Sequence, residues 1–180
     1  DLSDRLLRIV QDLLVIARIE RGVPLGDGEP IVLDHFLERA VTAARRLHPL
    51  TSVELTVEPG LPLVSGDEGY LEQVMRNLVS NAVKYGRSRV AVTARPTAVG
   101  VAVAVADDGP GFAPGELDRV WELFWRGSRE GRKPGAGIGL YVSRRLVEAM
   151  GGEIEAANGP TGGAVLTVTL RAHAPLPDEP

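Results

Sequence analysis

The most constraining feature of this sequence is an apolar run that alternates between bulky and small side chains and ends at a sharp turn. Valine occupies positions 99, 101, 103 and 105, whereas alanine occupies positions 102, 104 and 106. A period of two is typical of a β-strand, whose successive side chains point to opposite faces of a sheet. We therefore predict a strand over Val99–Ala106, with one face packed tightly and the other covered thinly.

Other periodic segments surround this strand in an order that limits the fold. Helical spacing predicts helices over residues 1–20, 33–47, 67–85 and 138–150, and alternation predicts strands over residues 53–57, 61–64, 89–95, 153–157 and 164–170. Helices and strands in this order are typical of the α/β class. We predict a two-layer α/β sandwich, in which one helical layer covers a mixed sheet.

The first helix carries a heptad pattern of apolar residues. Its seam consists of Leu2, Leu6, Ile9, Leu13 and Ile16, and Leu7, Val10, Leu14 and Ala17 widen that seam. A face of this width is typical of a helical bundle. Two interpretations stay open: the helix packs against partner helices, which we favour because the seam reaches the first residues, or it packs on its own domain.

Composition indicates where the chain divides into segments and argues against several functional classes. A segment rich in glycine and proline follows the first helix, so we place a helical segment at 1–22, a linker at 23–32, a domain at 33–171 and a tail at 172–180. The net charge of −4 argues against a nucleic-acid partner. The chain has no cysteine, and no apolar run reaches the ~20 residues of a membrane-spanning helix. Because it begins at Asp1 within a helical pattern, we expect a fragment.

The long helix over residues 67–85 carries a polar stripe beside its apolar face. At ~100° per residue, Asn81 and Lys84 fall within about 40° of Asn77. An amide oxygen suits a hard cation such as magnesium, and an ammonium suits a phosphate. An ordinary solvated helix face explains the stripe equally well when it is taken alone.

The turn Asp107-Asp-Gly-Pro-Gly111 directly follows the Val/Ala strand. A carboxylate at the strand end accepts a hydrogen bond from an exocyclic amine, which selects adenine over guanine, and the glycines let a flat ring lie against the backbone. The alternative is an ordinary turn, which the same residues also form.

Glycines at 135, 137 and 139 begin the helix over residues 138–150, where backbone N–H groups and the helix dipole favour an anion. The spacing matches neither the Rossmann nor the Walker fingerprint. Residues 112–134 precede them and combine aromatic with basic side chains, among them Trp121, Phe124, Trp125 and Arg126. We expect a lid over a triphosphate, although a surface loop pinned by aromatic residues is the simpler alternative.

Taken in order, these motifs resemble the catalytic and ATP-binding domain of sensor histidine kinases, with coverage from about Leu33 to Leu170. The matching residues are Asn77, Asn81, Lys84 and Tyr85 for the asparagine box; Asp107, Gly109 and Gly111 for the first glycine box; Phe124 for the aromatic box; and Gly135, Gly137, Ile138, Gly139 and Leu140 for the second glycine box. Residues 1–22 resemble the end of the dimerisation and phosphoacceptor hairpin. Gly86 and Trp125 depart from the family pattern without touching a presumed ligand.

The resemblance implies ATP and Mg²⁺ as cofactors. It implies that Asn77, Asn81 and Lys84 are catalytic, that Asn81 holds the metal and that Asp107 accepts the adenine amine. The remaining residues of the four boxes, together with Arg126, would bind the nucleotide. The γ-phosphoryl group would pass to a histidine of the hairpin and then to an aspartate of a response regulator.

The chain itself lacks a candidate phosphoacceptor. None of His35, His48 and His173 lies in the hairpin segment or in the family's Ser-His-Glu-like context, so we expect a fragment that does not autophosphorylate. The resemblance further implies a homodimeric parent and a cytoplasmic location, with any membrane anchor lying elsewhere in the parent. Two other readings stay open: an ATPase related to gyrase, which would place a glutamate base where Asn77 stands, or a nucleotide-binding module that has lost catalysis.

Overall fold

The computed structural model describes residues 2–21, 28–127 and 136–174. A five-stranded sheet forms its centre, with the strands in the order β2 (Ser52–Val57), β4 (Arg89–Pro96), β5 (Gly100–Asp107), β7 (Ala164–Arg171) and β6 (Glu153–Asn158). Strand β2 runs parallel to β4, and the other neighbouring pairs are antiparallel. The predicted mixed sheet and α/β class are therefore confirmed.

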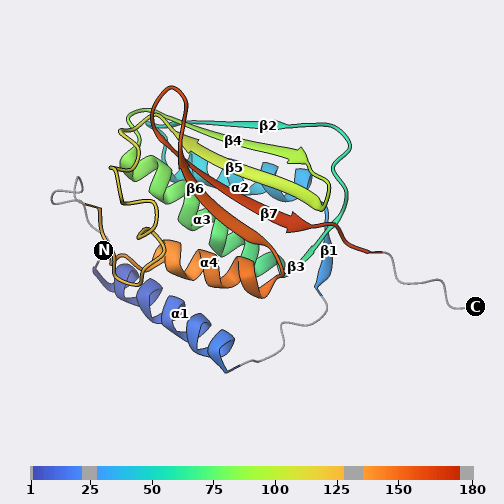
Figure 1. Cartoon of the computed structure of the whole chain (residues 1–180), viewed down its shortest axis with the longest axis horizontal. Coiled ribbons are helices and arrows are strands. Elements are labelled where there is room, and N and C mark those ends of the chain that lie inside the picture. The colour runs from blue at the N-terminus through green and yellow to red at the C-terminus, as the bar shows by residue number, and fades with distance from the viewer. Residues whose placement is uncertain (1, 22–27, 128–135, 175–180) are drawn as a thin grey trace, which may run out of the picture.

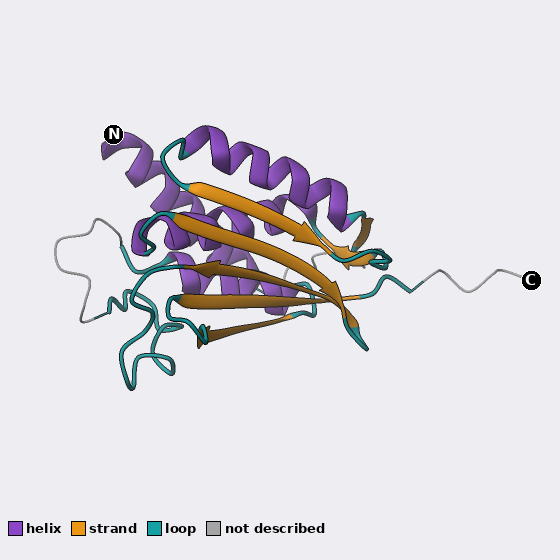
Figure 2. Cartoon of the chain, turned by 90° about the horizontal axis from the view of Figure 1, so that it is seen from above, coloured by secondary structure: helices purple, strands orange, loops and turns teal. Residues whose placement is uncertain are grey.

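Three helices cover one face of this sheet and leave the other face open (Figures 1 and 2). They are α2 (Leu33–Leu47), α3 (Glu68–Tyr85) and α4 (Gly139–Ala149). The core lies between the layers, where α3 contributes a fully buried stripe and β4, β5 and β7 contribute alternate residues. Within residues 2–21, 28–127 and 136–174, no helix covers the other face, in agreement with the two-layer prediction (Figure 2).

Strand β5 lies in the middle of the sheet and has the predicted asymmetry between its faces. Val101, Val103 and Val105 are buried towards the helices, whereas Ala104 and Ala106 on the open face are half-buried. Ala102, on the same open face, is buried as well, so the prediction of a thin cover holds only for the second half of the strand. The predicted start of the strand was wrong by one residue. A tight turn in which the Thr97 side chain accepts a hydrogen bond from the Gly100 amide (3.1 Å) leaves Val99 60% exposed outside the strand.

A small second sheet corrects the expected bounds of the linker and of the strand predicted over residues 61–64. Strand β1 (Glu29–Ile31) lies inside the predicted linker and pairs antiparallel with β3 (Val64–Gly66), which begins where the strand predicted over residues 61–64 was expected to end. The first residues of the predicted tail are also held, because the His173 amide donates to the Leu63 carbonyl at 2.7 Å. Glycine and proline content predicted a linker and a tail, but it could not reveal these contacts, because they are made with distant parts of the chain.

Helix α1 (Leu2–Glu20) lies against the helical layer and divides its apolar residues between two environments (Figure 1). Ile16 is buried, and Ile9 and Ile19 pack against the core. The Gln73 side-chain amide of α3 donates to Asp12 at 2.7 Å. The opposite face exposes Leu6, Leu7, Val10, Leu13 and Leu14. The helix thus packs on its own domain, the interpretation we placed second, while its other apolar face stays uncovered.

Among the helices that the structure describes, none combines the length and the apolar character that crossing a membrane requires.

Candidate functional site

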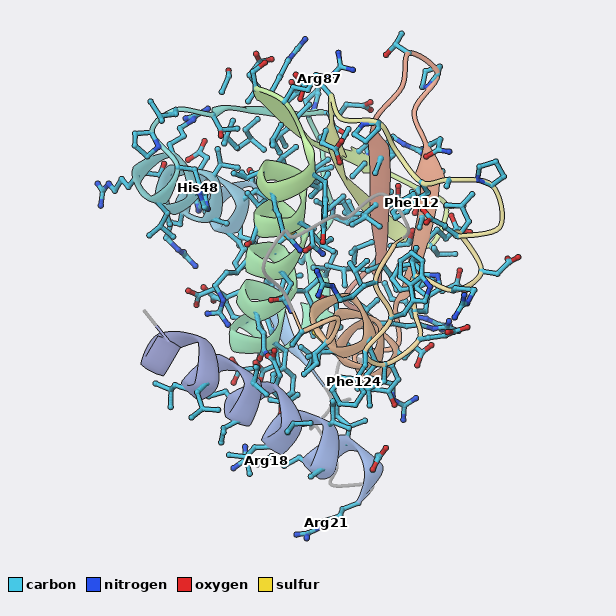
Figure 3. All side chains as sticks on the ribbon, turned by 90° about the vertical axis from the view of Figure 1, so that its left-hand side faces the viewer. Arg18, Arg21, His48, Arg87, Phe112 and Phe124 are labelled. Carbon is cyan, nitrogen blue, oxygen red and sulfur yellow. The ribbon has the colours of Figure 1, made fainter. Side chains whose placement is uncertain are left out.

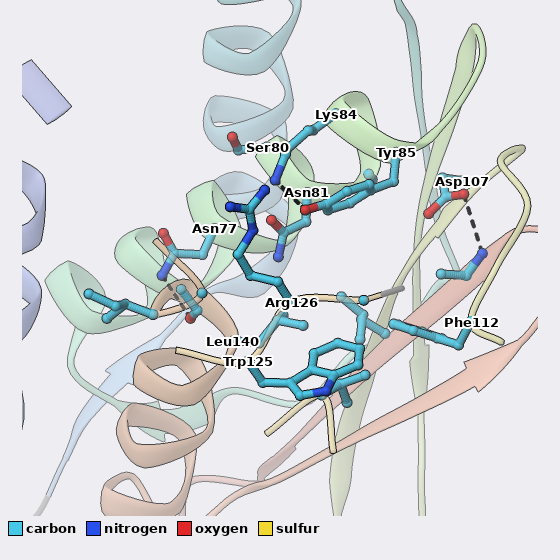
Figure 4. Close-up of a pocket in the computed structure, with 18 of the residues that line it drawn as sticks. Asn77, Ser80, Asn81, Lys84, Tyr85, Asp107, Phe112, Trp125, Arg126 and Leu140 are labelled. Carbon is cyan, nitrogen blue, oxygen red and sulfur yellow. Dashed lines mark hydrogen bonds between the residues drawn. The ribbon is translucent and has the colours of Figure 1, made fainter. Parts of the chain in front are cut away.

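A cavity of about 430 Å³ opens between α3, the start of α4 and the end of β5 (Figure 4). We call its two ends the helix end, formed by the polar stripe of α3, and the sheet end, formed by the last residue of β5, the residues that follow it and the first residues of β7. The lining includes Ile9, Asp12, Asn77, Ser80, Asn81, Lys84, Tyr85, Asp107, Pro110, Gly111, Phe112, Glu116, Trp125, Arg126, Gly137, Ile138, Gly139, Leu140 and Ala164. The structure therefore gathers three of the four predicted motifs around one hollow, together with Arg126.

The helix end follows from the periodicity of α3. Asn77, Asn81 and Lys84 all line the cavity, as the predicted stripe requires. Ser80 also lines it. Sequence reasoning missed Ser80, although it lies only about 60° from Asn77 around the helix. The opposite face of α3 is buried in the core, so the stripe is fixed in direction by packing.

The Asn77 side chain connects α3 to the first turn of α4. Its amide nitrogen donates to the Gly139 carbonyl at 3.2 Å and lies 3.3 Å from the Ser143 hydroxyl, which itself donates to the Gly139 carbonyl. Because a carbonyl oxygen can only accept, these contacts fix which end of the amide faces α4. The Asn77 carbonyl oxygen is therefore turned away from α4 (Figure 4).

A lysine and a tyrosine cooperate at the C-terminal end of the stripe. The Lys84 ammonium donates to the Tyr85 hydroxyl and lies 4.2 Å from the centroid of the Tyr85 ring. Both side chains are half-buried and line the cavity. A positive charge held over an aromatic face gains a favourable cation–π interaction. The pair thus keeps a cation at the cavity wall, where it can meet an anionic ligand.

The sheet end is built from backbone atoms in close approach. Asp107 Oδ1 accepts hydrogen bonds from the Gly109 amide at 2.8 Å and the Ala164 amide at 3.3 Å. A Cβ on Gly163 would lie 1.8 Å from the Asp107 carbonyl oxygen, and one on Gly109 would lie 2.3 Å from the Tyr85 carbonyl oxygen. Only glycine fits at either position, so the main chain packs closely around Asp107.

The neighbouring carboxylate, Asp108, has a different role. It accepts hydrogen bonds from the amides of Arg87 (2.7 Å) and Ser88 (3.1 Å) and from the Ser88 hydroxyl (3.0 Å). Desolvation raises the pKa of Asp108, but these backbone and hydroxyl donors together lower it well below its ordinary value. Asp108 is not part of the cavity wall and instead ties the end of β5 to the turn before β4.

The second glycine box lies where α4 begins. Gly137 has φ +70°, and its carbonyl accepts a hydrogen bond from the Phe124 amide at 2.9 Å. A Cβ on Gly137 would lie 2.5 Å from the Trp125 carbonyl oxygen. Gly137, Ile138, Gly139 and Leu140 line the cavity as expected, whereas Gly135 lies outside the described residues.

Two predicted residues do not line the cavity. Phe124 adopts φ +66° and is 61% exposed (Figure 3). Its neighbour Trp125, which we expected to lie away from the ligand, contributes to the wall instead (Figure 4). Gly109 acts indirectly, through its hydrogen bond to Asp107. Sequence reasoning could not separate Phe124 from Trp125, because both residues are aromatic and adjacent and only the backbone turn decides which side chain points inward.

Sequence reasoning missed several residues that line the cavity from outside the four motifs. Ile9 and Asp12 of α1 reach the cavity, and Phe112 and Glu116 line it from the segment after β5. The Glu116 carboxylate accepts a hydrogen bond from the Ala113 amide at 2.7 Å, which shapes that segment. No local pattern could have placed α1 beside the motifs of the later domain.

The three histidines lie elsewhere. His35 is exposed on α2, His48 follows the end of that helix, and the His173 ring shares a 2.8 Å hydrogen bond with the Ser65 hydroxyl. None of them lines the cavity.

The sequence matches a known protein family and several known proteins. Residues 66–174 match the family described as histidine kinase-, DNA gyrase B- and HSP90-like ATPases. The sensor protein KdpD of Escherichia coli (strain K12) is 35% identical over 167 residues, covering 91% of this chain and 18% of KdpD. The signal transduction histidine-protein kinase BaeS of the same strain is 31% identical, covering 97% of this chain and 38% of BaeS. The chain thus spans well under half of either relative.

Solved structures are similar to this chain in both sequence and fold. Full-length ShkA in complex with AMPPNP is 32% identical with a TM-score of 0.79, covering 96% of this chain and 38% of ShkA. The ATP-binding domain of PrrB from Mycobacterium tuberculosis is 29% identical with a TM-score of 0.68, covering 82% of this chain and 99% of the PrrB domain.

Proposed function

Because this chain belongs to the family of histidine kinase-, DNA gyrase B- and HSP90-like ATPases, as an ATP-binding catalytic domain of the sensor histidine kinase type, we propose that its cavity orients ATP with adenine at the sheet end and the phosphates at the helix end. The observation that carries this orientation is the separation of polar groups. The Asp107 carboxylate, held by main-chain amides, faces one end, and Lys84 with Asn77 and Asn81 faces the other.

At the sheet end, Asp107 would accept a hydrogen bond from the exocyclic amine of adenine. Its carboxylate is held in place by the Gly109 and Ala164 amides, so no rearrangement is required when the base enters. Guanine carries an oxygen at the matching position, and the two acceptors would then face each other without a donor. Selection against guanine follows from the lost hydrogen bond of the amine and from the repulsion between the two acceptors.

At the helix end, the residues present fit Mg²⁺. Among the described residues, no cluster of three His, Cys, Asp or Glu side chains forms a cage. Magnesium instead commonly uses one or two protein oxygens plus substrate phosphates. Asn81 would hold the ion, and Asn77, whose carbonyl oxygen is turned away from α4, would support it. When bound, the ion would neutralise phosphate charge as the transfer proceeds.

Lys84 and Arg126 would bind the phosphate oxygens, and Gly137, Gly139 and the start of α4 would offer main-chain N–H groups to the same anion. These residues orient the γ-phosphoryl group rather than react with it, since phosphoryl transfer depends mainly on positioning and charge stabilisation. A neutral imidazole nitrogen of the hairpin would form the new N–P bond while the bond from the γ-phosphorus to the bridging oxygen of ADP breaks.

The acceptor histidine lies outside this chain in our proposal. A hairpin from a homodimeric parent would supply it, and a receiver domain of a response regulator would take the phosphoryl group onto an aspartate. Relatives named as sensor proteins and histidine kinases support this assignment.

Nucleotide titration and transfer in trans together test the proposal. We expect the chain to bind ADP in calorimetry, to bind GDP far more weakly, and to form acid-labile phosphohistidine only when a hairpin carrying a histidine is added. No detectable ADP binding would overturn the nucleotide assignment.

ATP turnover by the chain alone separates the kinase from a gyrase-like ATPase. The gyrase-like alternative requires a carboxylate base where Asn77 stands, and an amide cannot remove a proton from water. Steady hydrolysis at ~1 per second or faster without any hairpin would favour that alternative.

A further inference from the structure

The turn between β6 and β7 reaches across to the sheet end of the cavity. Asn158, the last residue of β6, lies 46 positions from Phe112 in the sequence, yet its side chain contacts the Phe112 backbone. Phe112 lines the cavity and packs partly against the core (Figures 3 and 4). The turn is therefore part of the surroundings of the site, although it contributes little to the wall itself.

One amide side chain satisfies both polar main-chain groups of Phe112. The Phe112 N–H donates to Asn158 Oδ1 at 2.7 Å, and Asn158 Nδ2 donates to the Phe112 carbonyl at 3.0 Å. Both distances lie within the usual range for such bonds. Two bonds from one planar group fix the position and also the orientation of the Phe112 peptide units.

Gly111, the residue before Phe112, has the backbone conformation and the missing side chain that this contact requires. Gly111 has φ +68°, and a Cβ there would lie 2.5 Å from Asn158 Oδ1. The space that a side chain would need is thus taken by the Asn158 amide. Gly111 and Asn158 together specify how the chain turns from β5 into the cavity wall.

The same β6–β7 turn also holds Asp107. Gly163 packs directly on the Asp107 carbonyl, and the Ala164 amide donates to Asp107 Oδ1 at 3.3 Å. A single short turn therefore contacts both the carboxylate and the aromatic residue of the sheet end. A displacement of this turn would move both groups at once.

We propose that Asn158 is a positioning residue of the nucleotide site, which acts through Phe112 to hold the sheet-end wall in the shape that receives the base. This inference rests on the proposed placement of adenine at the sheet end. Asn158 itself is exposed and does not line the cavity, so it contributes no direct contact to the ligand.

The experiment compares Asn158→Ala with Thr161→Ala, a change to an exposed residue of the same turn. Kd for ADP is measured by calorimetry with and without Mg²⁺, and hydrogen exchange is measured at the Phe112 amide without nucleotide. We expect Asn158→Ala to speed exchange at Phe112 and to weaken ADP and ATP by the same factor, about 5- to 20-fold. The effect of Mg²⁺ on affinity should be unchanged, and Thr161→Ala should stay within about twofold of the parent.

An Asn158→Asp variant decides the matter if Asn158→Ala does not fold. A carboxylate can still accept from the Phe112 amide but cannot donate to its carbonyl, so an intermediate loss of ADP affinity is expected. Folded variants that bind ADP as tightly as the parent, despite faster exchange at Phe112, would overturn the inference. Failure of the parent chain to bind ADP would instead overturn the proposed function, because the exchange measurement needs no nucleotide.

Discussion

The two ends of the cavity are built in different ways. At the sheet end, glycines let main-chain atoms approach within distances that exclude any side chain, and long-range hydrogen bonds hold Asp107 and Phe112. At the helix end, polar side chains project from successive turns of α3, and Lys84 is held by its neighbour Tyr85. A flat base requires a wall of fixed shape, whereas a phosphate chain with a metal ion requires donors that adjust. The comparison suggests that backbone substitutions should damage the first end most and charge substitutions the second.

The largest expected effect concerns the backbone of the sheet end. Gly163 and Gly60 share φ +81°, but a Cβ on Gly60 meets nothing within 4 Å, whereas one on Gly163 overlaps the Asp107 carbonyl. We expect Gly60→Ala to cost about 1 kcal/mol of unfolding free energy through backbone strain alone. Gly163→Ala should cost about 3 kcal/mol or more and abolish ADP binding, as judged by urea denaturation and calorimetry. Equal losses for the two variants would show that close packing at Gly163 is unimportant.

The next effect concerns the carboxylate of the sheet end. Asp107→Asn should weaken ATP by about 1.5–3 kcal/mol, the usual worth of a hydrogen bond to a charged group. The melting temperature should change little, because the new amide oxygen can still accept from the Gly109 amide. Unchanged ATP affinity in calorimetry would place the adenine contact elsewhere.

A smaller effect is expected at the helix end. Lys84→Met removes a partly exposed positive charge while keeping most of the length of the side chain. ATP affinity should fall about fivefold at low salt and less at high salt, because screening weakens the lost interaction. Adenosine, which has no phosphate, should bind as it does to the parent chain. An equal loss for adenosine would contradict the division of the cavity into two ends.

The smallest effect concerns stability and pH at Asp108. Its carboxyl pKa is lowered in the folded chain, so the stabilisation is complete above the ordinary carboxyl range near pH ~4 and is lost as the pH falls below it. Asp108→Asn should lower the melting temperature by about 2–4 °C at neutral pH and reduce its decline on acidification. ADP affinity should be unaffected, in contrast to Asp107→Asn. If the melting temperature of Asp108→Asn fell on acidification as steeply as that of the parent chain, other carboxylates would dominate the loss of stability at low pH.

Much of the helix end could be predicted from the sequence, because one helical period places Asn77, Asn81 and Lys84 together without any knowledge of the fold. The alternation of β5 likewise predicted its buried and open faces. The supports of the sheet end could not be predicted, since Asn158 and Gly163 lie about 50 residues from their partners and no local pattern links them. Helix α1 shows the same limit, because a heptad pattern identifies apolar faces but not which face meets the domain.

The open face of the sheet offers a practical use. Thr93 of β4 is exposed there, and Thr167 of β7 is half-buried on the same side, while the chain contains no cysteine. A cysteine placed at Thr93 would be the sole thiol in this chain, remote in the fold from the buried layer. A spin label or dye attached at that position would report the orientation of this domain relative to a labelled hairpin in a larger assembly, with no background labelling from the domain.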